Sequence, residues 1–100
     1  MIEVFVSSDA EIDLLDGIEY YESKQQGLGT FFRTSILADL TSLELLGGSH
    51  AKKFGFHRKL CKTFPFWVYY RMESESLLTV VAVVGQKRGD EYLEARLGGG

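Results

Sequence analysis

The chain contains a single cysteine, Cys61, and a single proline among its 100 residues. One cysteine excludes an internal disulfide, which fits a reducing cytoplasm. No apolar run approaches the roughly 20 residues of a membrane-spanning helix, and the first residues lack the basic and apolar segments of a signal peptide. We therefore expect a cytoplasmic protein with one domain over residues 1–97 and a flexible glycine tail at 98–100.

Motifs for small ligands are lacking as well. The sequence has no GxxxxGK[ST] phosphate-binding loop, and the Gly-Leu-Gly at 27–29 lacks the third glycine of a dinucleotide-binding fingerprint. His50, His57 and Cys61 are spaced too irregularly for a typical metal site. We expect no metal and no cofactor, and we interpret Cys61 as a small buried hydrophobic residue.

Basic side chains are scarce in the first half of the chain. Residues 1–50 hold nine acidic and two basic side chains, whereas residues 51–100 hold five acidic and nine basic. Six of the basic residues follow one another with no acid between them: Lys52, Lys53, Arg58, Lys59, Lys62 and Arg71. Such a segment can meet an anionic partner, but lysine and arginine at a sheet margin also discourage edge-to-edge pairing. Charge alone leaves both interpretations open.

Three consecutive strands are predicted over residues 56–84. Pro65 fits a turn or a strand start, and the five residues after it are all aromatic or β-branched. Because side chains alternate along a strand, Trp67 and Tyr69 share one face and Tyr70 takes the other. Residues 77–84 are almost entirely apolar, which predicts a strand covered on both faces.

A short strand at residues 2–6 and two amphipathic helices precede these strands. Ser8 and Glu11 match a capping box, which starts the first helix. The apolar side of this helix is formed by Leu14, Leu15, Ile18 and Tyr21, and the opposite side, interpreted as a solvated face, by Asp13, Asp16, Glu19 and Glu22. Gly17 costs roughly 1 kcal/mol of helix stability relative to alanine and allows close helix packing.

The second helix begins near Thr30 and ends at Gly47 and Gly48. Its buried stripe is predicted to comprise Phe32, Ile36, Leu40 and Leu43, widened by Phe31, Leu37 and Leu46. Residues 49–55 form a polar, basic loop, and Asp90 is a plausible N-cap for a last short helix. The prediction is an α+β fold of order β-α-α-β-β-β-(α), with two antiparallel helices on one face of a largely antiparallel sheet.

Basic residues of the strands are the best candidates for chemistry. Arg58 and Lys62 are predicted to point one way from their strand, whereas His57, Lys59 and Cys61 point the other. Arginine and lysine can hold phosphates or stabilise charge during phosphodiester transfer, and Tyr92 or His57 can in principle move a proton. Solvated charge at the rim of a sheet explains the same residues.

An ordered series of short motifs runs along the chain. It comprises Ile18-Glu19-Tyr20-Tyr21-Glu22, Gly27-Leu28-Gly29 with Phe32, Phe64-Pro65-Phe66 with Val68-Tyr69-Tyr70, Val81-Ala82-Val83-Val84, Lys87-Arg88 and Arg96-Leu97. Over residues 3–97 this series resembles the RelE/ParE superfamily of type II toxin–antitoxin toxins. RelE-like members are ribosome-dependent endoribonucleases, whereas ParE-like members poison DNA gyrase. Both kinds are neutralised by an antitoxin protein.

The resemblance also assigns roles to residues. Arg58 matches the basic position on the family's second strand, Lys87 and Arg88 match the basic pair after the last long strand, and Tyr92 lies near a late aromatic or histidine. In a nuclease, Arg58, Arg88 and Tyr92 would be catalytic. The phosphate- or target-binding residues would be Lys59, Lys62, Arg71 and Lys87.

Several departures from the nuclease pattern favour the ParE-like branch. Gly85 stands where many relatives have histidine, and the net charge is −3, whereas ribosome-directed nucleases are usually strongly basic. We therefore predict a ParE-like toxin that binds a protein target such as DNA gyrase, with roles such as plasmid stabilisation. The alternatives are a ribosome-dependent mRNA interferase and an attenuated antitoxin-binding module. We expect exposed apolar surface for the antitoxin, possible homodimers without it, and no membrane association.

Overall fold

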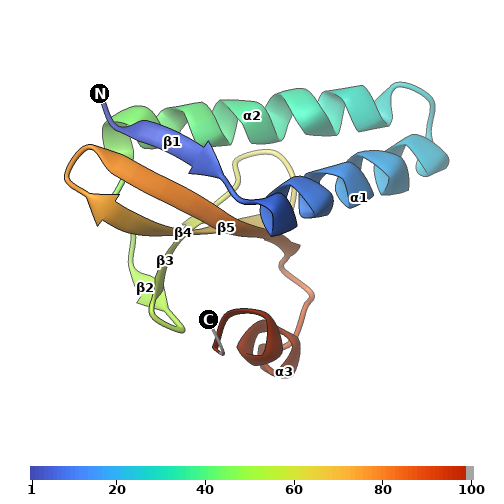
Figure 1. The fold of residues 1–100 in the computed structure, drawn as a ribbon. Helices are drawn as coiled ribbons and strands as arrows, with labels where there is room; N and C mark the ends of the chain where they lie inside the picture. Colours follow the sequence, from blue (N-terminus) through green and yellow to red (C-terminus); the bar gives the residue numbers. More distant parts are fainter. Residues whose placement is uncertain (99–100) are drawn as a thin grey trace.

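A five-stranded sheet separates a long helical hairpin from a short C-terminal helical segment in this computed structural model, which describes residues 1–98 (Figure 1). The elements are β1 (Glu3–Val6), α1 (Ser8–Lys24), α2 (Leu28–Leu46), β2 (Lys52–Lys53), β3 (Phe56–Leu60), β4 (Phe66–Ser74), β5 (Leu77–Gly85), α3 (Asp90–Leu93) and the π-helical η1 (Glu94–Gly98). The predicted α+β fold is confirmed. The two-residue strand β2 was not predicted, and Gly99 and Gly100 of the predicted tail lie outside the described residues.

The sheet has the strand order β1-β5-β4-β3-β2. β1 pairs with β5 in parallel, and the other neighbours are antiparallel. A bulge interrupts the β4–β5 register after Tyr69, which pairs with Ala82, since Tyr70 pairs with Val80. Within residues 1–98, no helix is long and apolar enough to cross a membrane.

The helical hairpin covers one face of the sheet, and Gly17 makes its close packing possible. A Cβ atom on Gly17 would lie 2.5 Å from Cε2 of Phe32, far inside van der Waals contact. The Phe32 ring also stacks on Tyr21 and meets Phe64 and Phe66 edge-on. The close helix packing predicted at Gly17 is therefore confirmed.

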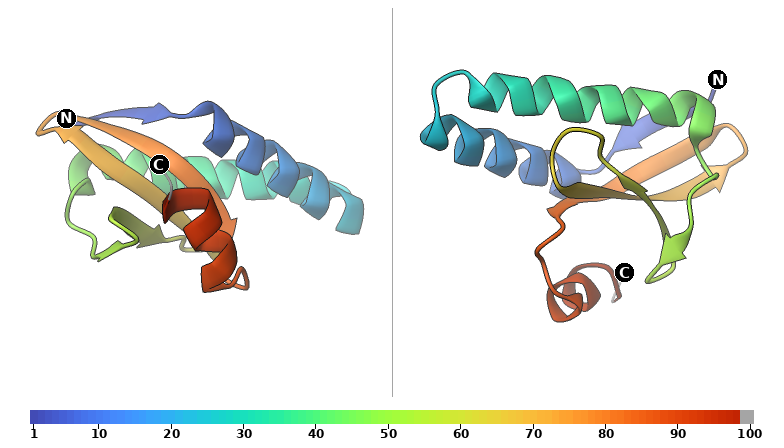
Figure 2. Two further views of the ribbon diagram at one scale, coloured as in Figure 1. Left: turned by 60° about the horizontal axis from the view of Figure 1, so that its bottom comes forward. Right: turned by 180° about the vertical axis from the view of Figure 1, so that it is seen from behind.

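The other face of the sheet is covered by the C-terminal segment, as the turned views in Figure 2 show. Leu93 and Leu97 pack there on Tyr69 and Ala82. The strand β5 is thus buried on both faces, and Tyr69 and Tyr70 point to opposite faces, as predicted.

Two helix caps lie one residue before their predicted positions. The N-cap of α1 is Ser7, whose hydroxyl accepts the Ala10 N–H at 3.2 Å, so the capping box predicted at Ser8 and Glu11 is wrong. The reason is that the Ser7 N–H still bonds to Val80 O, which keeps the chain in the sheet up to that residue. The N-cap of α3 is Gly89 instead of Asp90.

Three residues assigned to the buried stripe of α2 are exposed: Phe31, Leu37 and Leu46. That part of the prediction is wrong, because the buried stripe, with Phe32 and Ile36, already fills the contact with α1 and the sheet. Leu15 on α1, placed on its apolar side, is also 65% exposed. The outer surface of the hairpin is therefore more apolar than folding alone requires.

Candidate functional site

Arg58 lies over an aromatic ring on the sheet face that also holds α3. Its guanidinium carbon is 3.9 Å from the centroid of the Trp67 ring. The β3–β4 register places them together, since Arg58 pairs with Tyr69 and Trp67 lies two residues away on the same face. A cation–π contact of this kind leaves N–H donors of the guanidinium available for an anion.

Arg88 makes a second pair of this kind with Tyr92. Its guanidinium carbon lies 4.6 Å from the Tyr92 ring centroid. A turn places Arg88 there, because its N–H donates to Gly85 O at 3.1 Å. The neighbouring Lys87 is exposed on the same turn. The structure thus brings together Arg88 and Tyr92, two of the three residues that the nuclease alternative requires.

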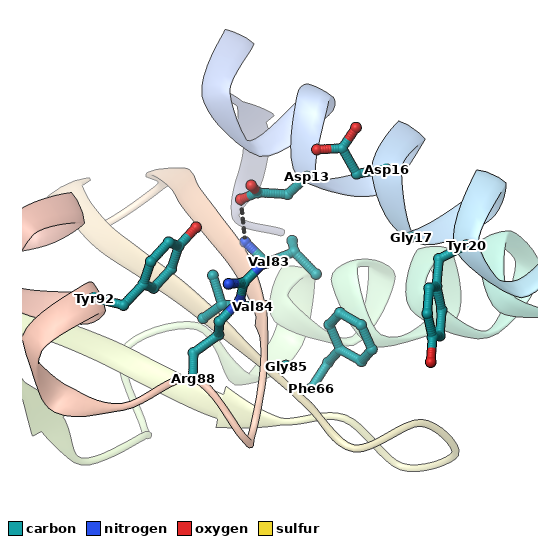
Figure 3. Close-up of a pocket in the computed structure, with 10 residues that line it drawn as sticks. All are labelled: Asp13, Asp16, Gly17, Tyr20, Phe66, Val83, Val84, Gly85, Arg88 and Tyr92. Carbon is teal, nitrogen blue, oxygen red and sulfur yellow. Dashed lines mark hydrogen bonds between the residues drawn. The ribbon is translucent and has the colours of Figure 1, made fainter.

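A cleft of about 330 Å³ lies beside Arg88 and Tyr92, between α1 and the chain after β5 (Figure 3). Its residues are Asp13, Asp16, Gly17 and Tyr20 from α1, Phe66 from β4, Val83, Val84 and Gly85 from β5, and Arg88 and Tyr92. An acidic wall on α1 therefore faces a basic and aromatic wall. This cleft was not predicted from the sequence, since its two walls are about 70 residues apart along the chain.

One wall of the cleft is fixed by a bidentate salt bridge between Arg96 and Asp13. The two N–O distances are 2.9 and 2.7 Å, and Asp13 Oδ2 also accepts the Val83 N–H at 2.8 Å. Hydrogen bonds to this carboxylate raise the pKa of Arg96 above its usual value. Asp13 was predicted on a solvated face, and its partly buried position corrects that prediction.

Lys59 is not placed to bind a phosphate or a protein target. Its side chain is 6% exposed and forms an ion pair of 2.8 Å with Asp39 of α2, itself 4% exposed. The sequence placed Lys59 correctly on the side of β3 opposite Arg58, but could not show that this side is covered by α2. The predicted binding role of Lys59 is therefore corrected to a buried ion pair.

Lys62 and Arg71 are exposed, but neither joins the pairs formed by Arg58 and Arg88. β3 ends at Leu60, so alternation no longer applies to Lys62, whose N–H donates to Asp39 on the α2 side. Arg71 forms an ion pair of 3.1 Å with Glu73. A hydrogen bond from Thr79, together with Arg71, lowers the pKa of Glu73.

The histidines and the cysteine have structural partners. The buried Tyr70 hydroxyl accepts the Gly48 N–H at 2.9 Å and lies 2.5 Å from Nδ1 of His50. His57 donates through Nδ1 to His50 O at 2.6 Å. Burial raises the pKa of Cys61 to about 12, which makes the thiol a poor nucleophile. Among residues 1–98, no group of three or more His, Cys, Asp or Glu side chains is arranged to hold a metal ion.

A second surface feature is an apolar groove of about 250 Å³ on the outside of the helical hairpin. Its residues are Glu11, Leu14, Leu15 and Ile18 from α1 and Arg33 and Leu37 from α2. We call it the hairpin groove. Its exposed leucines are the same ones that the sequence placed on buried faces.

The architecture, a helical hairpin on one face of a five-stranded α+β sheet, has a counterpart among solved structures. The chain is similar to a chain of the chromosomal ParDE TA system from P. aeruginosa, with a TM-score of 0.75. The match covers 85% of this chain and 96% of that chain, at 12% sequence identity. No family model and no curated protein matches the sequence. The fold expected from the ParE resemblance is therefore confirmed.

Proposed function

We propose that this protein is the toxin component of a type II toxin–antitoxin module, of the ParE type, and that it inhibits growth by binding a protein target such as DNA gyrase. The observation behind the proposal is the fold match to a ParDE TA system, which extends over almost the whole of the matched chain. The ordered RelE/ParE motifs of the sequence independently support a type II toxin, and the departures from the nuclease pattern favour the ParE type.

The hairpin groove is the surface that we assign to the antitoxin. Leu15 and Leu37 expose apolar surface there between Glu11 and Arg33, charges of opposite sign. An amphipathic helix fits such a groove, because its leucines enter the apolar centre and its charged residues meet Arg33 or Glu11. This surface lies on the hairpin, whereas the pairs of Arg58 and Arg88 lie toward the other face of the sheet.

The basic residues that remain accessible are the proposed contacts with the target: Arg58, Lys62, Arg71, Lys87 and Arg88. The two arginines that lie over aromatic rings, Arg58 and Arg88, offer guanidinium N–H donors, which suit carboxylates on a protein partner. This arrangement supports binding more than cleavage, because Gly85 provides no acid–base group at the end of β5 and the Tyr92 hydroxyl already accepts a hydrogen bond from Arg96.

An mRNA interferase remains the second candidate, favoured by the pairing of Arg88 with Tyr92. A purified-component assay separates the two functions. The protein is added to gyrase with relaxed plasmid, and separately to translating ribosomes with a defined mRNA. Inhibited supercoiling with intact mRNA supports our proposal, whereas ribosome-dependent cleavage that is lost in Arg88→Ala establishes the interferase.

The antitoxin surface is tested with Leu15→Glu, which places a charge in the hairpin groove, and Leu45→Glu as the matched control. Leu45 is exposed on α2 outside the groove. With an antitoxin encoded beside the gene, Leu15→Glu is expected to abolish rescue from growth arrest, and Leu45→Glu to retain it. Equal rescue by the antitoxin in both variants would contradict the assignment of the groove.

A further inference from the structure

The cleft between α1 and the chain after β5 presents charges that the fold does not use. Asp13 is occupied by Arg96 and Val83, but Asp16 and Arg88 form no ion pair with any part of the chain that the structure describes. They belong to opposite walls (Figure 3). A volume of about 330 Å³ suits a small organic ligand better than a folded segment.

One wall offers a fixed site for an anion. The Arg88 guanidinium lies over the Tyr92 ring, with its carbon 4.6 Å from the ring centroid, and this contact restricts where the guanidinium can lie. A guanidinium edge matches two oxygens of a phosphate group, and stacking reduces the conformational freedom that binding would otherwise cost.

The body of the cleft suits a planar aromatic ligand. Tyr20, which is 55% exposed, and the partly exposed Tyr92 lie at opposite ends, with the half-buried Phe66 between them (Figure 3). Nucleobases stack readily on such rings, whichever base is involved.

Asp16 adds selectivity among bases. An ionised carboxylate only accepts hydrogen bonds and can accept two parallel ones. Among the common bases, guanine presents two adjacent N–H donors on its Watson–Crick edge. Adenine and cytosine place a ring nitrogen that accepts at the equivalent position, and uracil has a single N–H donor there.

We propose that this cleft binds a guanosine 5′-phosphate group, with the phosphate on Arg88, the base among the aromatic rings and its N–H edge on Asp16. The group can come from the free nucleotide or from the 5′ end of a single-stranded nucleic acid. The site shares Arg88 with the proposed target contacts, but nucleotide binding requires neither an antitoxin nor a protein target.

The proposal is tested by isothermal titration calorimetry, which measures the affinity of the purified full chain for GMP, AMP and guanosine. GMP is expected to bind at least tenfold more tightly than either AMP, which lacks the paired donors, or guanosine, which lacks the phosphate. Asp16→Asn should remove most of the preference for GMP over AMP. Arg88→Gln should reduce GMP affinity to that of guanosine, and Lys52→Gln, on β2 outside the cleft, should leave it unchanged.

Equal binding of GMP and AMP, or no binding of GMP at millimolar concentration, would overturn the proposal. A dinucleotide beginning with a 5′-phosphorylated guanosine distinguishes the two sources. Binding at least tenfold tighter than GMP identifies a strand end, and equal binding identifies the free nucleotide. Circular dichroism of each variant ensures that lost binding is not lost folding.

Discussion

Arg96 donates hydrogen bonds from Nη1 and Nη2 to the carboxylate of Asp13, although the two residues are 83 positions apart in the chain. The same carboxylate accepts the Val83 N–H of β5. One acidic side chain therefore ties α1, the central sheet and the C-terminal segment together. This contact sets the position of the wall that carries Tyr92.

Removal of this carboxylate should loosen the C-terminal segment. We expect Asp13→Ala to reduce the free energy of unfolding by about 3 kcal/mol, because it leaves a partly buried guanidinium without its partner. Urea unfolding measures the loss, and amide hydrogen exchange should accelerate in residues 90–98. Asp16→Ala, one turn further along α1, is the control and should change stability by less than about 0.5 kcal/mol. Equal losses in the two variants would show that the salt bridge contributes little.

For the buried ion pair of Lys59 and Asp39, we expect the loss of one partner to destabilise the protein more than the replacement of both. Lys59→Ala should cost about 3–5 kcal/mol, because Asp39 would remain buried without a counter-charge. Replacing both residues by apolar ones, Lys59→Met with Asp39→Leu, should recover most of that loss. Thermal or urea unfolding of the three proteins gives the comparison. A double variant less stable than Lys59→Ala would contradict this prediction and would show that the ion pair stabilises the fold.

Gly17 provides a test of helix packing. Alanine there gains about 1 kcal/mol in helix propensity, but its Cβ would meet the Phe32 ring at 2.5 Å. Overpacking of a core typically costs about 1–3 kcal/mol, so we expect Gly17→Ala to lower the melting temperature. Gly98→Ala, where the nearest atom is 3.9 Å away, should leave it nearly unchanged. A rise in melting temperature for Gly17→Ala would mean that α1 and α2 can move apart without a loss of stability.

His50 predicts a pH dependence of stability. Burial lowers its pKa from the usual 6.5, and the positive charges of Lys59 and His57 act in the same direction. As pH falls below 6.5, the unfolded chain takes up a proton that the folded chain resists, so the free energy of unfolding decreases. Urea unfolding between about pH 7 and 5.5 should show this decrease. His50→Asn keeps an acceptor without titrating, and its curve should be flatter; parallel curves would exclude His50 as the source.

Local patterns in the sequence predicted most of the fold. Periodicity identified the helical hairpin and the three long strands, because apolar spacing reports directly on which face is buried. The caps shifted by one residue, since hydrogen bonding of Ser7 to β5 decides where α1 begins, and this partner is remote in sequence. The exposure of Leu37 was not predicted for a similar reason. Apolar residues at helical spacing form the same sequence pattern whether the protein itself or a partner covers them.

The candidate site was predictable only in part. Strand alternation separated Arg58 from Lys59 correctly, but whether a lysine is solvated or buried depends on what packs above it, here Asp39 of α2. Arg88 and Tyr92 are only four positions apart, so their proximity could be expected from the sequence. The cleft depends on Arg96 meeting Asp13, and no local pattern indicates a contact across 83 residues.

The toxin function itself is tested by induced expression in a bacterial host, with DNA damage signalling and mRNA integrity followed in parallel. A ParE-like toxin should cause growth arrest with filamentation, a DNA damage response and intact mRNA, reversed by the antitoxin. Rapid mRNA cleavage on ribosomes would contradict this prediction in favour of the interferase. Unimpeded growth with soluble, folded protein would contradict a toxin function altogether.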